Sequence, residues 1–181
     1  LYAPQDYYEN IKENIAYLKG ETYNQIGNYQ QTINILTDFE NTYKESKLIN
    51  YVNMALGFAY LNLEKFNEAK KYYELVVNAK SSDAKTKSLA NLFITTCYKK
   101  MNQVHTAQSM LSTLAVEPNY PYLSQVLLEL GQIYYEQKDY DLAKRTLERA
   151  EREADNVKTQ IRIISLLAAS YLELKQYSNA I

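Results

Sequence analysis

Histidine and cysteine, the two residue types that most often build metal or nucleophilic sites, each occur once in this sequence. His105 lies two residues after Gln103, near an expected helix start, where a solvent-exposed side chain is the favoured interpretation. Cys97 has no partner for a disulfide within the chain. A zinc cluster or a Cys–His nucleophile needs several such groups close together, so we predict no metal and no cofactor. A site made of carboxylates alone remains open.

Two further patterns could belong to binding sites. Gly20 and Gly27 lie seven residues apart, but neither a preceding strand nor a Gly-Lys-Ser/Thr sequence accompanies them, so no phosphate-binding loop is predicted. The charge run over 148–153 could be a docking site. We favour a solvated helix face with pairs such as Glu148 and Arg152, each worth about 0.2–0.5 kcal/mol. The sequence therefore predicts no catalytic residue and no enzyme.

The charge balance also limits the partners. With 20 basic and 21 acidic residues, no strong field draws the chain to nucleic acid or to an anionic membrane. No uncharged apolar run of about 18 residues occurs, so no membrane insertion is predicted. Most of the 19 tyrosines have a packing explanation given below. The better candidates for an exposed recognition surface are Tyr7, Tyr8, Tyr17, Tyr51 and Tyr135.

The elements that must position any site are revealed by an internal repeat. A small residue is followed three positions later by tyrosine, six positions after that by an aromatic residue or valine, and three positions later by a second small residue. Successive tyrosines of this pattern are 37, 38, 36 and 37 residues apart. The five copies are Gly20-Tyr23-Tyr29-Thr32, Gly57-Tyr60-Phe66-Ala69, Thr95-Tyr98-Val104-Ala107, Gly131-Tyr134-Tyr140-Ala143 and Ala168-Tyr171-Tyr177-Ala180.

The spacing within each copy is helical. Leu56, Tyr60 and Leu63 share one face, so each copy predicts two amphipathic helices. The small residues, such as Gly57 and Ala69, would let the paired helices approach closely. Helix starts are predicted at three places rich in residues able to cap a helix N-terminus, and the Pro118-Asn119-Tyr120-Pro121 stretch is predicted to be a connector. The predicted starts are Asn28, the stretch Ser81-Ser82-Asp83, and Asp139.

This order of small, tyrosine, aromatic and alanine residues resembles the tetratricopeptide repeat. The resemblance implies an all-α, right-handed α-solenoid of antiparallel helix pairs, a single array over 1–181 with about four and a half repeats. The period is longer than the 34 residues usual in that family, and the third copy, with Thr95 and Val104, departs most. The predicted repeats are 13–49, 50–86, 87–122, 123–159 and 160–181, with 1–12 as a preceding helix or extension.

In tetratricopeptide arrays the first helix of each pair lines a concave groove, and its lining can be transferred by counting from each small residue. The resemblance thus implies a groove that is apolar in its middle and amide-rich or acidic toward the fourth repeat. The lysines and asparagines with which some members clamp chaperone tails are replaced here by Tyr17, Glu21, Ala55, Leu89 and Phe93. The implied partner-binding residues are Tyr17, Glu21, Asn24, Tyr51, Met54, Phe58, Leu92, Phe93, Glu129, Gln132 and Tyr135, with Leu128, Arg162 and Ser165 beside them.

The function implied is a non-catalytic scaffold or adaptor, a segment of a larger bacterial protein that binds a partner helix or peptide. The sequence pattern from Tyr29 to Ser46 is similar to that of envelope-assembly proteins. This similarity favours a periplasmic or envelope location over the cytoplasm. It also implies that the protein takes part in cell-envelope or flagellar assembly. The alternative is a peptide-sensing regulatory domain of a transcriptional or enzymatic protein, with Asn14, Asn24 and Asn62 holding the peptide backbone. A third interpretation is a spacer or self-associating module.

Overall fold

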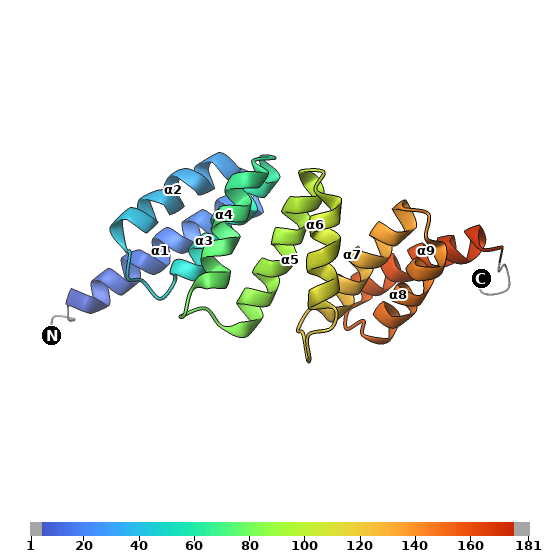
Figure 1. Cartoon of the computed structure of the whole chain (residues 1–181). Helices are drawn as coiled ribbons and strands as arrows, with labels where there is room; N and C mark the ends of the chain where they lie inside the picture. The colour runs from blue at the N-terminus through green and yellow to red at the C-terminus, as the bar shows by residue number, and fades with distance from the viewer. Residues whose placement is uncertain (1–4, 176–181) are drawn as a thin grey trace. The chain divides into compact units, whose positions relative to one another are not determined.

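The computed structural model describes residues 5–175, with the side chains described from residue 8 onward. In this range the chain is entirely helical and contains no strand (Figure 1). None of the described helices is long and apolar enough to cross a membrane. The helices are α1 (Gln5–Gln25), α2 (Tyr29–Thr42), α3 (Ile49–Asn62), α4 (Phe66–Asn78), α5 (Ala84–Lys100), α6 (Val104–Leu114), α7 (Leu123–Glu136), α8 (Tyr140–Arg152) and α9 (Val157–Glu173).

The chain divides into two compact units, residues 1–101 and 102–181. In the first unit each of α1 to α4 packs against the next helix in sequence, and α1 also contacts α3. In the second unit α6 to α9 pack in the same sequential manner, and α7 also contacts α9. The division falls in the turn between α5 and α6, inside the predicted third repeat. The prediction of one array with the stated repeat boundaries stays a prediction.

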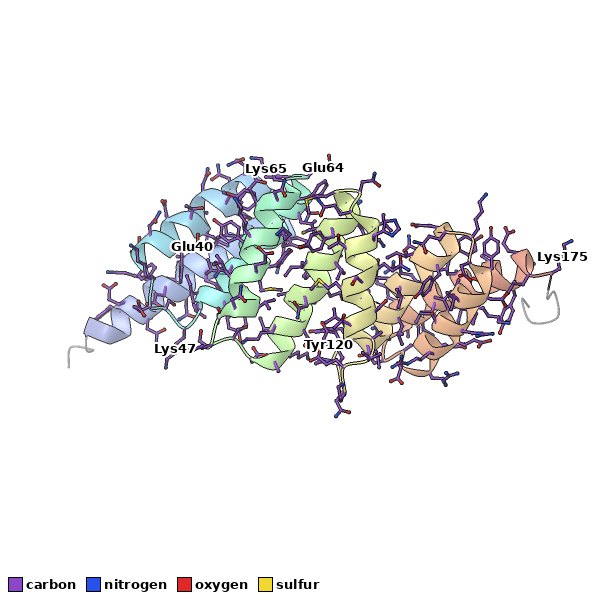
Figure 2. All side chains as sticks on the ribbon, in the orientation of Figure 1. Glu40, Lys47, Glu64, Lys65, Tyr120 and Lys175 are labelled. Atoms are coloured by element: carbon purple, nitrogen blue, oxygen red, sulfur yellow. The ribbon has the colours of Figure 1, made fainter. Side chains whose placement is uncertain are left out.

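The residues that follow the C-terminal ends of α1, α3, α5, α7 and α9 share one backbone conformation. Gly27, Glu64, Asn102, Lys138 and Lys175 each have a positive φ, between 57° and 76°. Each lies four residues after a tyrosine of the repeat. In three turns the next residue donates its backbone N–H to that tyrosine's carbonyl, at 2.9 Å, which is the pattern of a Schellman motif. Figure 2 labels Glu64 and Lys65 at the turn between α3 and α4.

Close approach of paired helices depends on glycine at three positions. A Cβ added at Gly20 would lie 2.4 Å from Leu36, one at Gly57 would lie 2.7 Å from the Tyr73 ring, and one at Gly131 would lie 2.7 Å from Leu147. The facing residue is therefore one helical turn beyond the second small residue of the repeat. Leu36, Tyr73 and Leu147 are all fully buried. The second small residues Thr32, Ala69, Ala107 and Ala143 are fully buried as well.

The predicted helix starts are confirmed at three caps. The side chains of Asn28, Asp83 and Asp139 accept hydrogen bonds from the backbone N–H groups of Gln31, Thr86 and Leu142. The predicted connector 118–121 lies within 115–122, a segment without helix, although α6 ends at Leu114 and not near Glu117; Tyr120 is buried in this connector (Figure 2). Residues 5–12, predicted as a preceding helix or extension, are the start of α1 itself. Tyr177 and Ala180 lie outside the described residues.

Candidate functional site

A groove of about 540 Å³ is formed within the first unit. It draws side chains from α1, α3 and α5, with Tyr29 from the start of α2. Seven of the residues that the repeat count placed in a groove come together here. The described lining residues are Tyr17, Glu21, Asn24, Gln25, Tyr29, Tyr51, Met54, Ala55, Phe58 and Phe93.

Aromatic rings form the walls of this groove. Tyr17 of α1 and Tyr51 of α3 have ring centroids 6.4 Å apart, and Tyr29 meets Phe58 edge-on at 6.2 Å. Tyr51 is 47% exposed and Phe58 is 38% exposed, although both lie in an otherwise close-packed helix. Aromatic side chains held by neighbouring rings offer apolar surface at a small cost in conformational entropy. The walls are therefore suited to contact with another molecule.

Phe93 combines packing with exposure to the groove. Its ring stacks on the fully buried Tyr73 ring, with centroids 5.0 Å apart and an interplanar angle of 11°. The same residue lines the groove while half-buried. Phe93 therefore packs against the core through its ring and also forms part of the groove wall. Tyr73 in turn contacts the position of Gly57.

The polar end of the groove lies on α1. Asn24 is 7% exposed and donates through Nδ2 to the backbone carbonyl of Ala55 in α3, at 3.1 Å. Its Oδ1 is buried and has no hydrogen-bond partner among the described residues. Burial raises the pKa of the Glu21 carboxyl, and a hydrogen bond from the Asn24 side chain acts in the opposite direction. Burial, with Glu21 and Tyr51 nearby, raises the pKa of Tyr17 to about 12, which keeps this phenol neutral.

The second unit has a cavity of its own, of about 520 Å³, between α7 and α9. It includes Gln132 and Tyr135, which the repeat count had placed in the groove. Arg162 lies on its wall and pairs with Glu129 of α7 at 3.3 Å, so the positive charge of Arg162 is already neutralised. The described lining residues are Leu128, Gln132, Tyr135, Glu136, Ile161, Arg162, Ser165 and Leu166.

Some of the residues predicted to bind a partner do not line the groove of the first unit. Leu92 is half-buried and does not line the groove of the first unit. Of the three asparagines considered for holding a peptide, Asn14 bonds to Asn10 and Asn62 to the Phe58 carbonyl, both on exposed helix surfaces. Only Asn24 lines the groove. Tyr8 is 52% exposed and lies on α1 outside the described lining.

The repeat tyrosines pack at the margins of the core, where they remain partly exposed. Tyr60 stacks on Tyr72 at 5.3 Å, Tyr140 meets Tyr135 edge-on at the same distance, and Tyr171 donates to Glu148 at 2.8 Å. The remaining packing positions are also half-buried: Tyr23, Phe66, Tyr98, Tyr134 and Ala168. Sequence reasoning missed the buried Tyr120, because a single tyrosine between two prolines has no periodic signal.

The charge run over 148–153 differs from a simple solvated face. Glu148 accepts the Tyr171 hydroxyl of α9, and Arg149 donates to the Ala115 carbonyl at the end of α6, at 2.9 Å. These two residues therefore join α8 to its neighbours within the second unit, since an arginine at a helix C-terminus satisfies an unpaired carbonyl. His105 is exposed on the first turn of α6. Within 5–175, no group of three or more His, Cys, Asp or Glu side chains could hold a metal ion.

Comparison with known families agrees with the repeat. Tetratricopeptide-repeat models match residues 51–83 and 125–156, within the predicted second and fourth repeats. The chain contains tetratricopeptide repeats, which correspond to the α3–α4 and α7–α8 hairpins. A search of the curated proteins found no match to the sequence.

Several solved structures share the fold of this tetratricopeptide-repeat chain at low sequence identity. The apo form of the quorum sensor NprR from B. thuringiensis is 17% identical, with a TM-score of 0.81 over 93% of this chain and 51% of that one. The Pseudomonas aeruginosa protein pilF is 18% identical, with a TM-score of 0.74 over 94% and 72%. The apo form of RapI is 12% identical, with a TM-score of 0.74 over 92% and 51%. The chain thus spans about half the length of two of these proteins.

Proposed function

We propose that this chain is a non-catalytic interaction module that binds a peptide or a helix of a partner protein in the groove of its first unit. The observation that carries the proposal is the composition of that groove. The exposed rings of Tyr51 and Phe58 on α3 lie in the same groove as a buried amide, Asn24, whose acceptor has no partner among the described residues. Peptide ligands match such a surface, because apolar side chains cover the rings and backbone N–H groups can satisfy the acceptor.

The groove of the first unit is a better candidate than the cavity of the second. Glu129 and Arg162 already neutralise each other beside the second cavity. In the first groove, Asn24 has a buried acceptor whose desolvation is uncompensated, at a typical cost of about 1–3 kcal/mol. A ligand that donates to this oxygen would recover that free energy, which gives the first groove a specific driving force for binding.

A matched pair of tyrosines tests the proposal. The whole chain is immobilised, short peptides are selected from a random phage-displayed library, and the affinities of selected peptides are measured by calorimetry. We expect Tyr51→Ala to weaken binding at least tenfold, because the ring forms the groove wall. Tyr8→Ala removes a similarly exposed ring on α1 outside the groove lining and should leave binding unchanged. Equal affinities for both variants, or no selected peptide, would refute the proposal.

A peptide-sensing regulatory domain is the second candidate, supported by the fold shared with the quorum sensor NprR and by the single asparagine that lines the groove. A sensor must change another property when its peptide binds. The full-length protein should then alter its oligomeric state or the activity of an attached domain on addition of a selected peptide. Binding without any such change would favour the scaffold.

The compartment and assembly state are further parts of the proposal. The Tyr29–Ser46 phrase supports a bacterial periplasmic or envelope location, with envelope or flagellar assembly as the process. Cell fractionation with an antibody to the full-length protein tests this location, and recovery only in the cytoplasmic fraction would refute it.

Self-association would appear in light scattering as a mass that rises with protein concentration, whereas a constant monomer mass would exclude self-association over the range measured.

A further inference from the structure

One end of the first unit's groove carries two hydrogen-bond acceptors on successive positions of a single helical face. Glu21 and Asn24 lie three residues apart on α1, so both side chains project from the same side of the helix. Both line the groove. Asn24 is fixed in place by its 3.1 Å bond to the Ala55 carbonyl, which leaves Oδ1 buried and without a partner among the described residues. This end of the groove lacks a donor.

The charge at this end is also uncompensated. Glu21 is the only charged side chain among the described residues that line the groove, where the others are aromatic, apolar or amide-bearing. Its recorded hydrogen bond comes from the neutral Asn24 side chain. A partly buried carboxylate with a single neutral donor is costly, because lost hydration is repaid by several hydrogen bonds or by a positive charge at close range. The groove is therefore complementary to a cationic ligand.

The rings around this acceptor pair select among cations. Tyr17 and Tyr51 lie at the same end, and Tyr17 is within electrostatic range of Glu21. A guanidinium group is planar and weakly hydrated, stacks on aromatic faces and carries five N–H donors in a rigid fork. It can satisfy a carboxylate and a separate amide oxygen while its flat side covers a ring. An ammonium group is compact and strongly hydrated, and it loses more hydration free energy on entering such a site.

We propose that Glu21 and Asn24 form a binding site for one arginine side chain of the peptide that occupies this groove. The arginine donates to the Glu21 carboxylate and to Asn24 Oδ1, and its aliphatic part lies along Tyr17 and Tyr51. The rest of the peptide follows the apolar wall toward Met54 and Phe58. The inference rests on the proposed peptide-binding function and adds the residue type that the groove selects.

The test uses the same phage-displayed library against the whole chain. We expect arginine at a fixed position of the selected peptides, several-fold above its frequency in the library. One selected peptide is then synthesised with arginine, lysine or citrulline at that position, since citrulline has the shape of arginine without its charge. Citrulline should weaken binding about 10- to 100-fold, the range given by hydrogen bonds to charged groups. Lysine should fall between the two.

Protein variants locate the effect. Glu21→Gln should bind the arginine and citrulline peptides with affinities within about threefold of each other. Glu13→Gln is the matched control, because Glu13 is a half-buried carboxylate on α1 that bonds to Ser46 outside the groove. This control should keep the full preference for arginine. Glu21→Gln should also unfold at or above the parent's temperature, since burial disfavours the charged carboxylate that the substitution removes.

The outcomes separate this inference from the function beneath it. Selected peptides that depend on Tyr51 but lack arginine, or that bind equally with citrulline, would overturn the arginine site and leave peptide binding intact. Equal affinity for lysine and arginine would overturn the assignment to arginine in favour of any cation. If Glu13→Gln and Glu21→Gln reduced the arginine preference equally, the site would lie elsewhere. Failure to select any peptide would refute the proposed function itself.

Discussion

Gly57→Ala tests whether close packing between α3 and α4 supports the groove. The new Cβ would lie 2.7, 2.8 and 2.9 Å from three atoms of the Tyr73 ring, distances at which one group must move. The ring is fully buried and stacks on Phe93, so it cannot shift without displacing a groove-lining side chain. The substitution therefore perturbs the core and the groove together.

The magnitude follows from two opposing effects. Inserting a methyl group into a well-packed core costs about 1–3 kcal/mol. Replacing glycine by alanine inside a helix recovers up to about 1 kcal/mol through helix propensity. The two effects leave a net cost between about 0 and 3 kcal/mol. Since three ring atoms lie under 3.0 Å from the new Cβ, we expect Gly57→Ala to lower the free energy of unfolding by about 1–2 kcal/mol and to weaken binding of a groove-selected peptide. Urea titration followed by circular dichroism at 222 nm measures the first effect, and calorimetry the second.

Gly131→Ala provides the matched control in the second unit. Its Cβ would lie 2.7 Å from the fully buried Leu147, so a comparable loss of stability is expected from the same physical cause. Leu147 belongs to the second unit and is not among the described residues that line the first groove, so peptide affinity should stay at the parent value. A Gly57→Ala protein as stable as the parent would refute the packing argument. A destabilised Gly57→Ala with unchanged peptide affinity would refute the coupling through Tyr73 and Phe93.

Three further predictions concern single side chains. Tyr73→Phe removes a buried hydroxyl that lacks a partner among the described residues and should raise the free energy of unfolding by about 1 kcal/mol in urea; a loss of stability would contradict this. Asn156→Ala removes the cap whose Oδ1 accepts from Thr159 N at 2.9 Å and should cost about 1 kcal/mol, whereas an unchanged urea midpoint would show the cap to be dispensable. Burial raises the pKa of Cys97 to about 11, so at pH 8 roughly one thiol in a thousand is ionised. Alkylation of Cys97, followed by mass spectrometry, should therefore be slow until urea unfolds the chain. Rapid labelling of the native protein would contradict the burial of this thiol.

The sequence could predict the helix pairs and the position of the groove because both follow from helical periodicity. Counting from Gly20 and Gly57 places Tyr17, Glu21 and Phe58 on one face, and the structure brings these residues together. The positive-φ turns gave no comparable signal. Where glycine occupies the turn, as at Gly27, the conformation could have been inferred, but Glu64, Lys138 and Lys175 occupy it in other repeats.

The unpartnered acceptor of Asn24 was also beyond sequence reasoning. An asparagine at this position could direct either end of its amide into the groove. The choice depends on the Ala55 carbonyl of another helix, which takes the donor and leaves the acceptor. Such pairing is a property of tertiary geometry, whereas the repeat pattern describes only spacing along each helix. The same limit applies to the charge run over 148–153. The sequence predicts a pair between Glu148 and Arg152 along one helix, but in the structure Glu148 accepts a hydrogen bond from Tyr171 of the neighbouring helix.

The repeat itself separates the residues that maintain the fold from those that give each groove its chemistry. The positions of Gly20, Tyr23 and Thr32 recur as small, tyrosine and small residues because helix approach and turn closure impose the same geometry each time. The position of Glu21 has no such constraint, since its side chain faces the groove. Its equivalents, one residue after each small residue, are Phe58, Thr96, Gln132 and Ala169. A carboxylate therefore occurs once in five copies, on a framework that would accept any of these residues. Because packing does not require Glu21 and burial penalises its charge, the arginine site that we propose supplies a role for this carboxylate, and Glu21→Gln tests it.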